Sequence, residues 1–107
     1  MALGIRLHDT LPGTLEERVA AAKAQGFTCA HVALSKLLGP AYMEPGCFTP
    51  GLAAYLRRAF DGLDIAVLGC YLTLAHQDEA LYRRTLEQYV AHLRLSAWLG
   101  GCVVGSE

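Results

Sequence analysis

The side chains that could do chemistry in this sequence are a small set of polar residues near the ends of short apolar segments. They are Arg6, His8, His31, Tyr71, His76 and Glu107. Guanidinium, imidazole, phenol and carboxylate groups bind small polar substrates, so the set predicts the wall of a substrate pocket. No single residue is predicted to be catalytic, because the sequence has neither a G-x-S-x-G nucleophile motif nor an H-x-x-x-H pair.

Arg6 and His8 stand two positions apart in the first apolar segment, so in a β-strand both would lie on one face. The alternate residues of that segment would face the helices: Leu3, Ile5 and Leu7. Because burying an unpaired charge is costly, a polar pair that points inward needs partners or a substrate. We therefore expect either that His8 lines a pocket or that it is a core histidine paired with Asp9 or a neighbouring carboxylate.

The other candidates also have two interpretations each. His31 shares a face of the second apolar segment with Cys29 and Ala33, and it either lines the pocket or packs in the core. Tyr71 either contacts a substrate or closes the top of the sheet. His76 is either functional or an exposed loop residue.

Two further polar residues lie later in the chain. Glu107 ends the fourth apolar segment, where it either touches a substrate or frays with the terminus. His92 stands in a helical segment between Tyr89 and Leu93, and we expect it on the surface.

Composition and charge exclude several classes of function. The net charge is −1 and the isoelectric point is about 6.4, so no basic surface for nucleic acid is expected. No apolar run approaches the roughly 18 residues of a membrane helix, and the N-terminus lacks the features of a signal peptide. We expect a cytoplasmic protein that binds neither nucleic acid nor membrane.

The four cysteines form no C-x-x-C motif and no zinc-finger spacing with histidine. Three of them lie in apolar segments, namely Cys29, Cys70 and Cys102. We expect reduced, buried thiols rather than disulfides, and no metal ligand within the chain.

Strand-like and helical segments alternate along the chain. The predicted strands span residues 3–7, 27–34, 65–72 and 102–107, with a long loop over residues 35–49. Predicted helices begin at Thr14, Thr49 and Asp78 and end near glycines. Thr14 and Glu17 match a capping box. The last helix is predicted to bury the stripe Tyr82, Leu86, Tyr89, Leu93 and Ala97.

Strand-to-strand spacings of about 24 to 38 residues match β-α units, which predicts an α/β fold with a parallel sheet. The pattern alone fits both a (β/α) barrel and an open doubly wound sheet. No G-x-G-x-x-G or G-x-x-x-x-G-K-[ST] motif follows a strand, so the nucleotide-binding form of the open sheet is disfavoured.

Several segments, in this order, resemble the sugar phosphate isomerase/epimerase superfamily, also called the xylose isomerase-like TIM barrels. The segments are IRLHD, TLEERVAAAKAQGF, GLDIAVLGCYL, LAHQDEALYRRTLEQYVAHLRLSAWLG and CVVGSE. The resemblance covers nearly the whole chain. The superfamily includes endonuclease IV-type repair enzymes, but their metal-binding histidine, three residues before the tyrosine that follows the third strand, corresponds to Leu68 here, so DNA repair is not expected.

The resemblance implies that residues 1–107 form one partial domain, the N-terminal half of a TIM barrel truncated after its fourth strand. It also implies a parent enzyme that abstracts a proton next to a carbonyl of a sugar or sugar phosphate. A divalent metal (Mn, Mg, Zn or Co) would stabilise the resulting charge. The family's metal ligands lie on strands five to eight, beyond Glu107, so this half would supply pocket walls.

Two other functions remain open. The chain could be a non-catalytic half barrel whose open strand edges pair with a second copy or with a separate C-terminal half. It could also be an inactive gene fragment.

Overall fold

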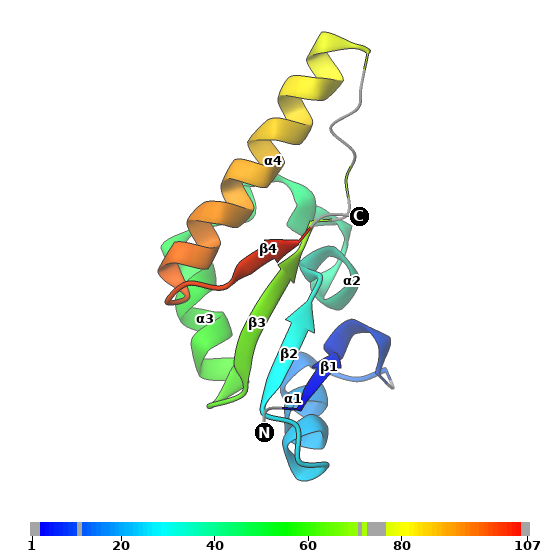
Figure 1. Cartoon of the computed structure of the whole chain (residues 1–107), viewed down its shortest axis with the longest axis vertical. Coiled ribbons are helices and arrows are strands. Elements are labelled where there is room, and N and C mark those ends of the chain that lie inside the picture. Colours follow the sequence, from blue (N-terminus) through cyan, green and yellow to red (C-terminus); the bar gives the residue numbers. More distant parts are fainter. Residues whose placement is uncertain (1–2, 11, 71, 73–76, 106–107) are drawn as a thin grey trace.

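Four parallel strands form a sheet in the computed structural model, which describes residues 3–10, 12–70, 72 and 77–105 (Figure 1). The strands are β1 (Gly4–Arg6), β2 (Cys29–Val32), β3 (Asp64–Gly69) and β4 (Val103–Gly105). Their order in the sheet is β1-β2-β3-β4, and each neighbouring pair is parallel. The predicted α/β class with a parallel sheet is confirmed.

Helices connect the strands in chain order. They are α1 (Leu15–Ala24), α2 (Leu34–Leu38), α3 (Pro50–Phe60) and α4 (Glu79–Trp98), with 3-10 turns η1 (Leu7–Asp9), η2 (Pro40–Met43) and η3 (Pro45–Cys47). The predicted helix starts are confirmed. Thr14 and Glu17 make both hydrogen bonds of a capping box, each 3.1 Å long, and Thr49 and Asp78 accept hydrogen bonds at the first turns of α3 and α4.

Helices α1, α3 and α4 cover one face of the sheet. Ala30 and Val32 of β2 and Leu68 of β3 are almost completely buried on that face. They belong to one hydrophobic core together with residues of all three helices, among them Leu56 of α3 and Leu95 of α4. The free energy that stabilises the fold therefore comes largely from one side of the sheet.

Strand order distinguishes the two architectures that fit the sequence pattern. A doubly wound sheet reverses its strand order at a switch point and carries helices on both faces. A (β/α) barrel keeps the strands in sequential order, with the helices outside. The described sheet is sequential and has one helix-covered face, so it is compatible with part of a (β/α) barrel.

The predicted first strand is too long. β1 ends at Arg6, and the next three residues form η1. His8 therefore does not lie on a strand, and the alternation that placed it beside Arg6 does not apply to it. Leu3 was predicted to face the helices but is 51% exposed, whereas Leu7 is fully buried in the core, as predicted.

The predicted loop over residues 35–49 is also wrong, because most of it is helical. Helix α2 begins directly after β2, and the turns η2 and η3 follow. Pro40 and Pro45 each occupy the first position of a turn, where a missing N–H group leaves no hydrogen bond unmade. Pro40 and Pro45 suggested a loop in the sequence, but in the structure each begins a short helical turn.

Helix α4 is rotated away from its predicted buried face. Leu93 of the predicted stripe is 58% exposed, and Tyr82, Leu86 and Ala97 are also exposed. The buried face instead contains Thr85, Gln88, Ala91, His92, Leu95 and Ser96. Four of these six side chains are polar, which is why hydrophobic periodicity gives the wrong rotation.

Hydrogen bonds explain the observed rotation of α4. The Gln88 side-chain amide donates to the backbone carbonyl of Met43 in η2 (3.0 Å). The Ser96 hydroxyl donates to the carbonyl of Cys102 (2.6 Å) and accepts from its N–H (2.9 Å). Rotating the apolar stripe inward would break these bonds and leave the partly buried backbone groups of Met43 and Cys102 without these partners. Such a loss costs up to about 1–3 kcal/mol for each group.

No helix in the described part of the chain is long and apolar enough to cross a membrane.

A matched pair of leucines tests the rotation of α4. Leu95→Ala should lower the free energy of unfolding by about 2–5 kcal/mol, because Leu95 is fully buried and its loss leaves a cavity. Leu93→Ala should change it by less than about 1 kcal/mol. Urea denaturation in dilute solution measures both values. A larger loss for Leu93→Ala would mean that α4 packs through its apolar stripe.

Candidate functional site

Arg6 and His31 lie side by side on the face of the sheet that the helices do not cover. They are register partners in the parallel pair β1–β2, so their side chains point to the same face. Along the same row, Val67 of β3 pairs with His31, and Val103 of β4, which is 64% exposed, pairs with Val67. The sequence-based placement of Arg6 on the first strand and of His31 within the second strand is correct.

A β-bulge lies next to His31. Ala30 pairs with Ile65 and His31 pairs with Val67, so β3 has Ala66 as an extra residue at this point. Such bulges change the direction of a strand and are common next to functional sites. Here the bulge keeps His31 and Val67 in one row on the open face.

His8 joins this pair although it is not on a strand. Its ring contacts that of His31 edge to face, with centroids 5.5 Å apart and an interplanar angle of 72°. The N–H of Ala33, just past β2, donates to His8 Nδ1 (3.3 Å), which fixes the orientation of the ring. Asp9, the partner considered for His8, lies in η1, but its side chain is outside the described part of the chain.

The η1 turn that positions His8 is held by hydrogen bonds to one carbonyl. The Leu7 carbonyl accepts from the Thr10 hydroxyl (2.7 Å) and from Arg18 Nη1 of α1 (3.3 Å). Leu7 itself is fully buried. The turn is therefore hydrogen-bonded to α1. It places His8 next to the carboxyl ends of β1 and β2.

Arg6, His8 and His31, called the polar cluster below, combine one guanidinium with two imidazoles. Arginine binds phosphate or carboxylate oxygens through two parallel N–H groups, and imidazole can donate to or accept from hydroxyl groups. This combination suits an anionic or hydroxyl-rich ligand. The described residues contain no group of three or more His, Cys, Asp or Glu side chains that could hold a metal ion.

Three sequence-predicted candidates, Tyr71, His76 and Glu107, lie outside the described residues. The structure therefore leaves their predicted roles untested. Only Arg6, His8 and His31 of the candidate set are brought together here.

The cysteines are all free thiols, as predicted. Burial raises the pKa of Cys70 to about 11 and also raises the pKa of Cys102, so neither is a reactive thiolate at neutral pH. Cys29 and Cys102 are only half-buried, which departs from the expectation of full burial.

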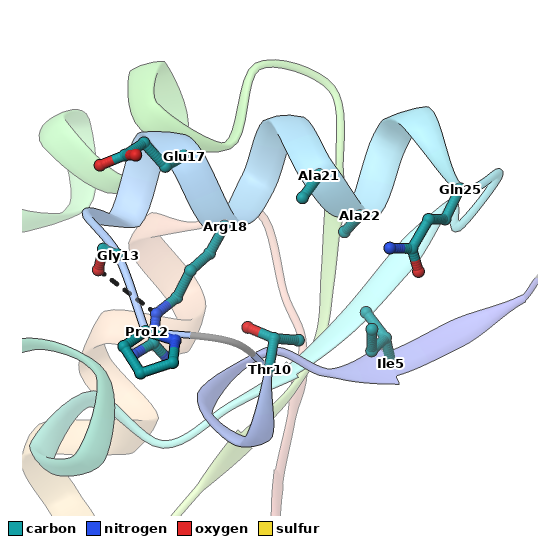
Figure 2. A pocket seen from close by; sticks show the side chains of 9 residues that line it. All are labelled: Ile5, Thr10, Pro12, Gly13, Glu17, Arg18, Ala21, Ala22 and Gln25. Carbon is teal, nitrogen blue, oxygen red and sulfur yellow. Dashed lines mark hydrogen bonds between the residues drawn. The ribbon is translucent and has the colours of Figure 1, made fainter.

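A pocket of about 150 Å³ lies between α1 and β1, on the other side of the sheet (Figure 2). Ile5, which lines it, is in register with the buried Ala30 and so faces the helices. Arg18 crosses one end and donates to the carbonyl of Gly13 (3.4 Å). The pocket is separated from the polar cluster by the sheet and is not part of the candidate site.

Sequence reasoning missed His92, which was predicted to be on the surface but is only 1% exposed. Its Nδ1 lies 2.7 Å from the carbonyl oxygen of Gln88, which places the proton of the neutral ring on Nδ1. Its ring packs against Phe48, with centroids 4.6 Å apart. Among the described residues Nε2 has no hydrogen-bond partner. One feature of the sequence could have indicated the burial of His92. It stands four residues, or about one helical turn, from both Gln88 and Ser96, on the polar side of α4.

Burial lowers the pKa of His92 below its usual value of 6.5, although the Gln88 contact opposes the shift. The unfolded chain therefore binds the additional proton first, and stability should fall as the pH drops below about 6.5. Thermal melts at about pH 7.5 and about pH 5.5 should show this loss, and it should be smaller in His92→Leu. A His31→Gln control should keep the His92 contribution. The same pH dependence in His92→Leu and the wild type would contradict the burial of a neutral His92.

Comparison of the chain with protein-family models and with curated proteins finds no match. The parallel (β/α) arrangement and the polar cluster are therefore the observations on which a function can be proposed.

Proposed function

We propose that this chain forms a substrate-binding wall of a (β/α)-barrel enzyme that isomerises or epimerises a sugar or sugar phosphate. The observation that carries the proposal is the polar cluster, in which Arg6 pairs with His31 across β1 and β2 while the His8 ring contacts that of His31. The cluster combines a cation with proton-carrying side chains at one place on the sheet.

The location of the cluster supports a binding role. Active sites of (β/α) barrels are built at the carboxyl ends of the strands. Arg6 is the last residue of β1, and His8 lies just beyond it over the end of β2. The side chains of Arg6 and His31 lie on the face that would be the interior of a barrel, because helices cover the opposite face.

The chemistry of the cluster suits a sugar phosphate or ketose. The Arg6 guanidinium can bind phosphate or hydroxyl oxygens, and a histidine can exchange protons near neutral pH. Isomerisation and epimerisation both need a proton removed next to a carbonyl. We assign substrate binding and orientation to this chain. The divalent metal of the resembling superfamily does not fit the described residues, which lack a ligand set, so no metal-dependent step is assigned to them.

The alternative function is a non-catalytic half barrel that pairs with another chain. The outer edges of the sheet favour it. Within the described residues, β1 and β4 each pair on one side only, so both outer edges could bind a second copy or a separate C-terminal half. Both strands are only three residues long, and short edges limit such pairing. Substrate binding at the polar cluster is therefore the preferred function.

Nuclear magnetic resonance with labelled histidine tests the proposal. Titration with fructose 6-phosphate should shift the ring signals of half-buried His31 and, through the contact between the two rings, those of the buried His8. The signals of His92, which is buried in α4, should not change. Fructose and inorganic phosphate, titrated separately, distinguish recognition of the sugar from recognition of the anion. Arg6→Ala should weaken binding of the phosphate ester at least about tenfold, because a charge-assisted hydrogen bond contributes about 1.5–3 kcal/mol.

Arg57→Ala is the matched control. Arg57 is exposed in the last turn of α3 and lines the same surface pocket as Asp64 and Ile65 at the start of β3, so it lies at the opposite end of the strands. Equal weakening by Arg57→Ala and Arg6→Ala would mean non-specific attraction of the anion. The absence of any shift at His8 and His31 would contradict the proposed site.

A further inference from the structure

Exposed apolar side chains are concentrated on α4. Eight large hydrophobic residues are exposed in the described part of the chain, and six of them belong to this helix. Those six are Leu81, Tyr82, Leu86, Val90, Leu93 and Trp98. Four of them, Tyr82, Leu86, Val90 and Leu93, lie within about 80° of one another round the helix. An exposed apolar stripe of this kind usually marks a protein–protein contact.

The helix also extends beyond the rest of the molecule. Its amino-terminal half projects past the end of the sheet in Figure 1. The molecule is elongated as a result, with extents of 45 × 26 × 25 Å. The radius of gyration is 14.0 Å, against about 13 Å expected for a compact domain of about 100 residues. One side of α4 is therefore accessible along most of its length.

A groove runs beside this surface. It has a volume of about 360 Å³ and lies between α4 and the segment around η3. Pro45 and Phe48 form one wall, and Ala91 and Val90 belong to the other. Glu87 and Arg94 also line it, so the groove combines apolar side chains with one charge of each sign.

The pattern on α4 is complementary to itself. Leu86 and Glu87 stand four and three positions before Val90, and Leu93 and Arg94 stand three and four positions after it. Each leucine is followed directly by the charged residue, about 100° further round the helix. The two leucines therefore lie on one flank of Val90, and the two charges lie on the other.

We propose that two copies of this chain pair through α4, with the helices antiparallel and a two-fold axis near Val90. Leu86 of one copy then lies next to Leu93 of the other, and Glu87 lies next to Arg94, each contact occurring twice as a two-fold interface requires. A parallel two-fold pair would instead place the charged flank of each helix against the leucine flank of the other, so the charges would have no opposite partner. Neither Glu87 nor Arg94 has an ion-pair partner among the described residues, so both are available to a second copy.

This surface is distinct from the polar cluster and from the strand edges, so the inference does not rest on the proposed substrate. A contact through one helix and its groove is small, and we expect a dimer that dissociates on dilution. Sedimentation of the full chain from about 1 μM to about 1 mM covers the relevant range of affinity. The wild type should convert from monomer to dimer within it.

Charge reversal identifies the partner as a second copy. Glu87→Arg or Arg94→Glu alone should raise the dissociation constant about tenfold, because two attractive pairs become repulsive. The double variant should return to within about threefold of the wild type, since its charges are again opposite. Val90→Asp should also weaken the dimer at least about tenfold. All three positions are exposed, so the variants should fold, which thermal melts can check.

Val103→Lys on the exposed edge strand β4 is the control and should leave the dimer unchanged. A wild type that stays monomeric up to about 1 mM would overturn the proposal. A dimer that Val103→Lys dissociates and Val90→Asp does not would place the contact on the strand edges and would also overturn it. So would a double variant as weak as the single reversals.

Discussion

One-sided burial of the sheet is the constraint on which the rest of the structure depends. Helices α1, α3 and α4 share a core with one face of the strands, built around Val32, Leu56, Leu68 and Leu95. Alternation along each strand then sends the intervening side chains to the opposite face. The polar residues of β1 and β2 reach an open surface because the apolar residues between them are held against the helices.

The same packing determines which surface of α4 is left exposed. Gln88, His92 and Ser96 take up the inward side, where Met43 and Cys102 supply backbone partners for Gln88 and Ser96. The apolar stripe faces outward as a consequence. A helix with polar groups inside and leucines outside is stable only because the inward hydrogen bonds are made, and it leaves an apolar surface suited to a partner.

Much of the fold can be predicted from local signals. Helix starts can be predicted because a capping side chain bonds to backbone groups only two or three residues away. The capping box of Thr14 and Glu17 and the pair Thr49 and Pro50 are the examples here. Arg6 and His31 can be placed because strand alternation is local too. The position of His8 and the rotation of α4 depend on long-range hydrogen bonds to Ala33, Met43 and Cys102, which no periodicity contains.

The accessibility of two cysteines tests the central claim most directly. Cys29 alternates with buried residues of β2 and shares the open face with His31, whereas Cys70 is fully buried at the end of β3. Alkylation of the folded chain, followed by mass spectrometry of each peptide, measures the two rates. We predict that Cys29 reacts readily and that Cys70 is protected until the chain unfolds. Equal rates at both cysteines, or a faster rate at Cys70, would contradict a sheet with one covered and one open face.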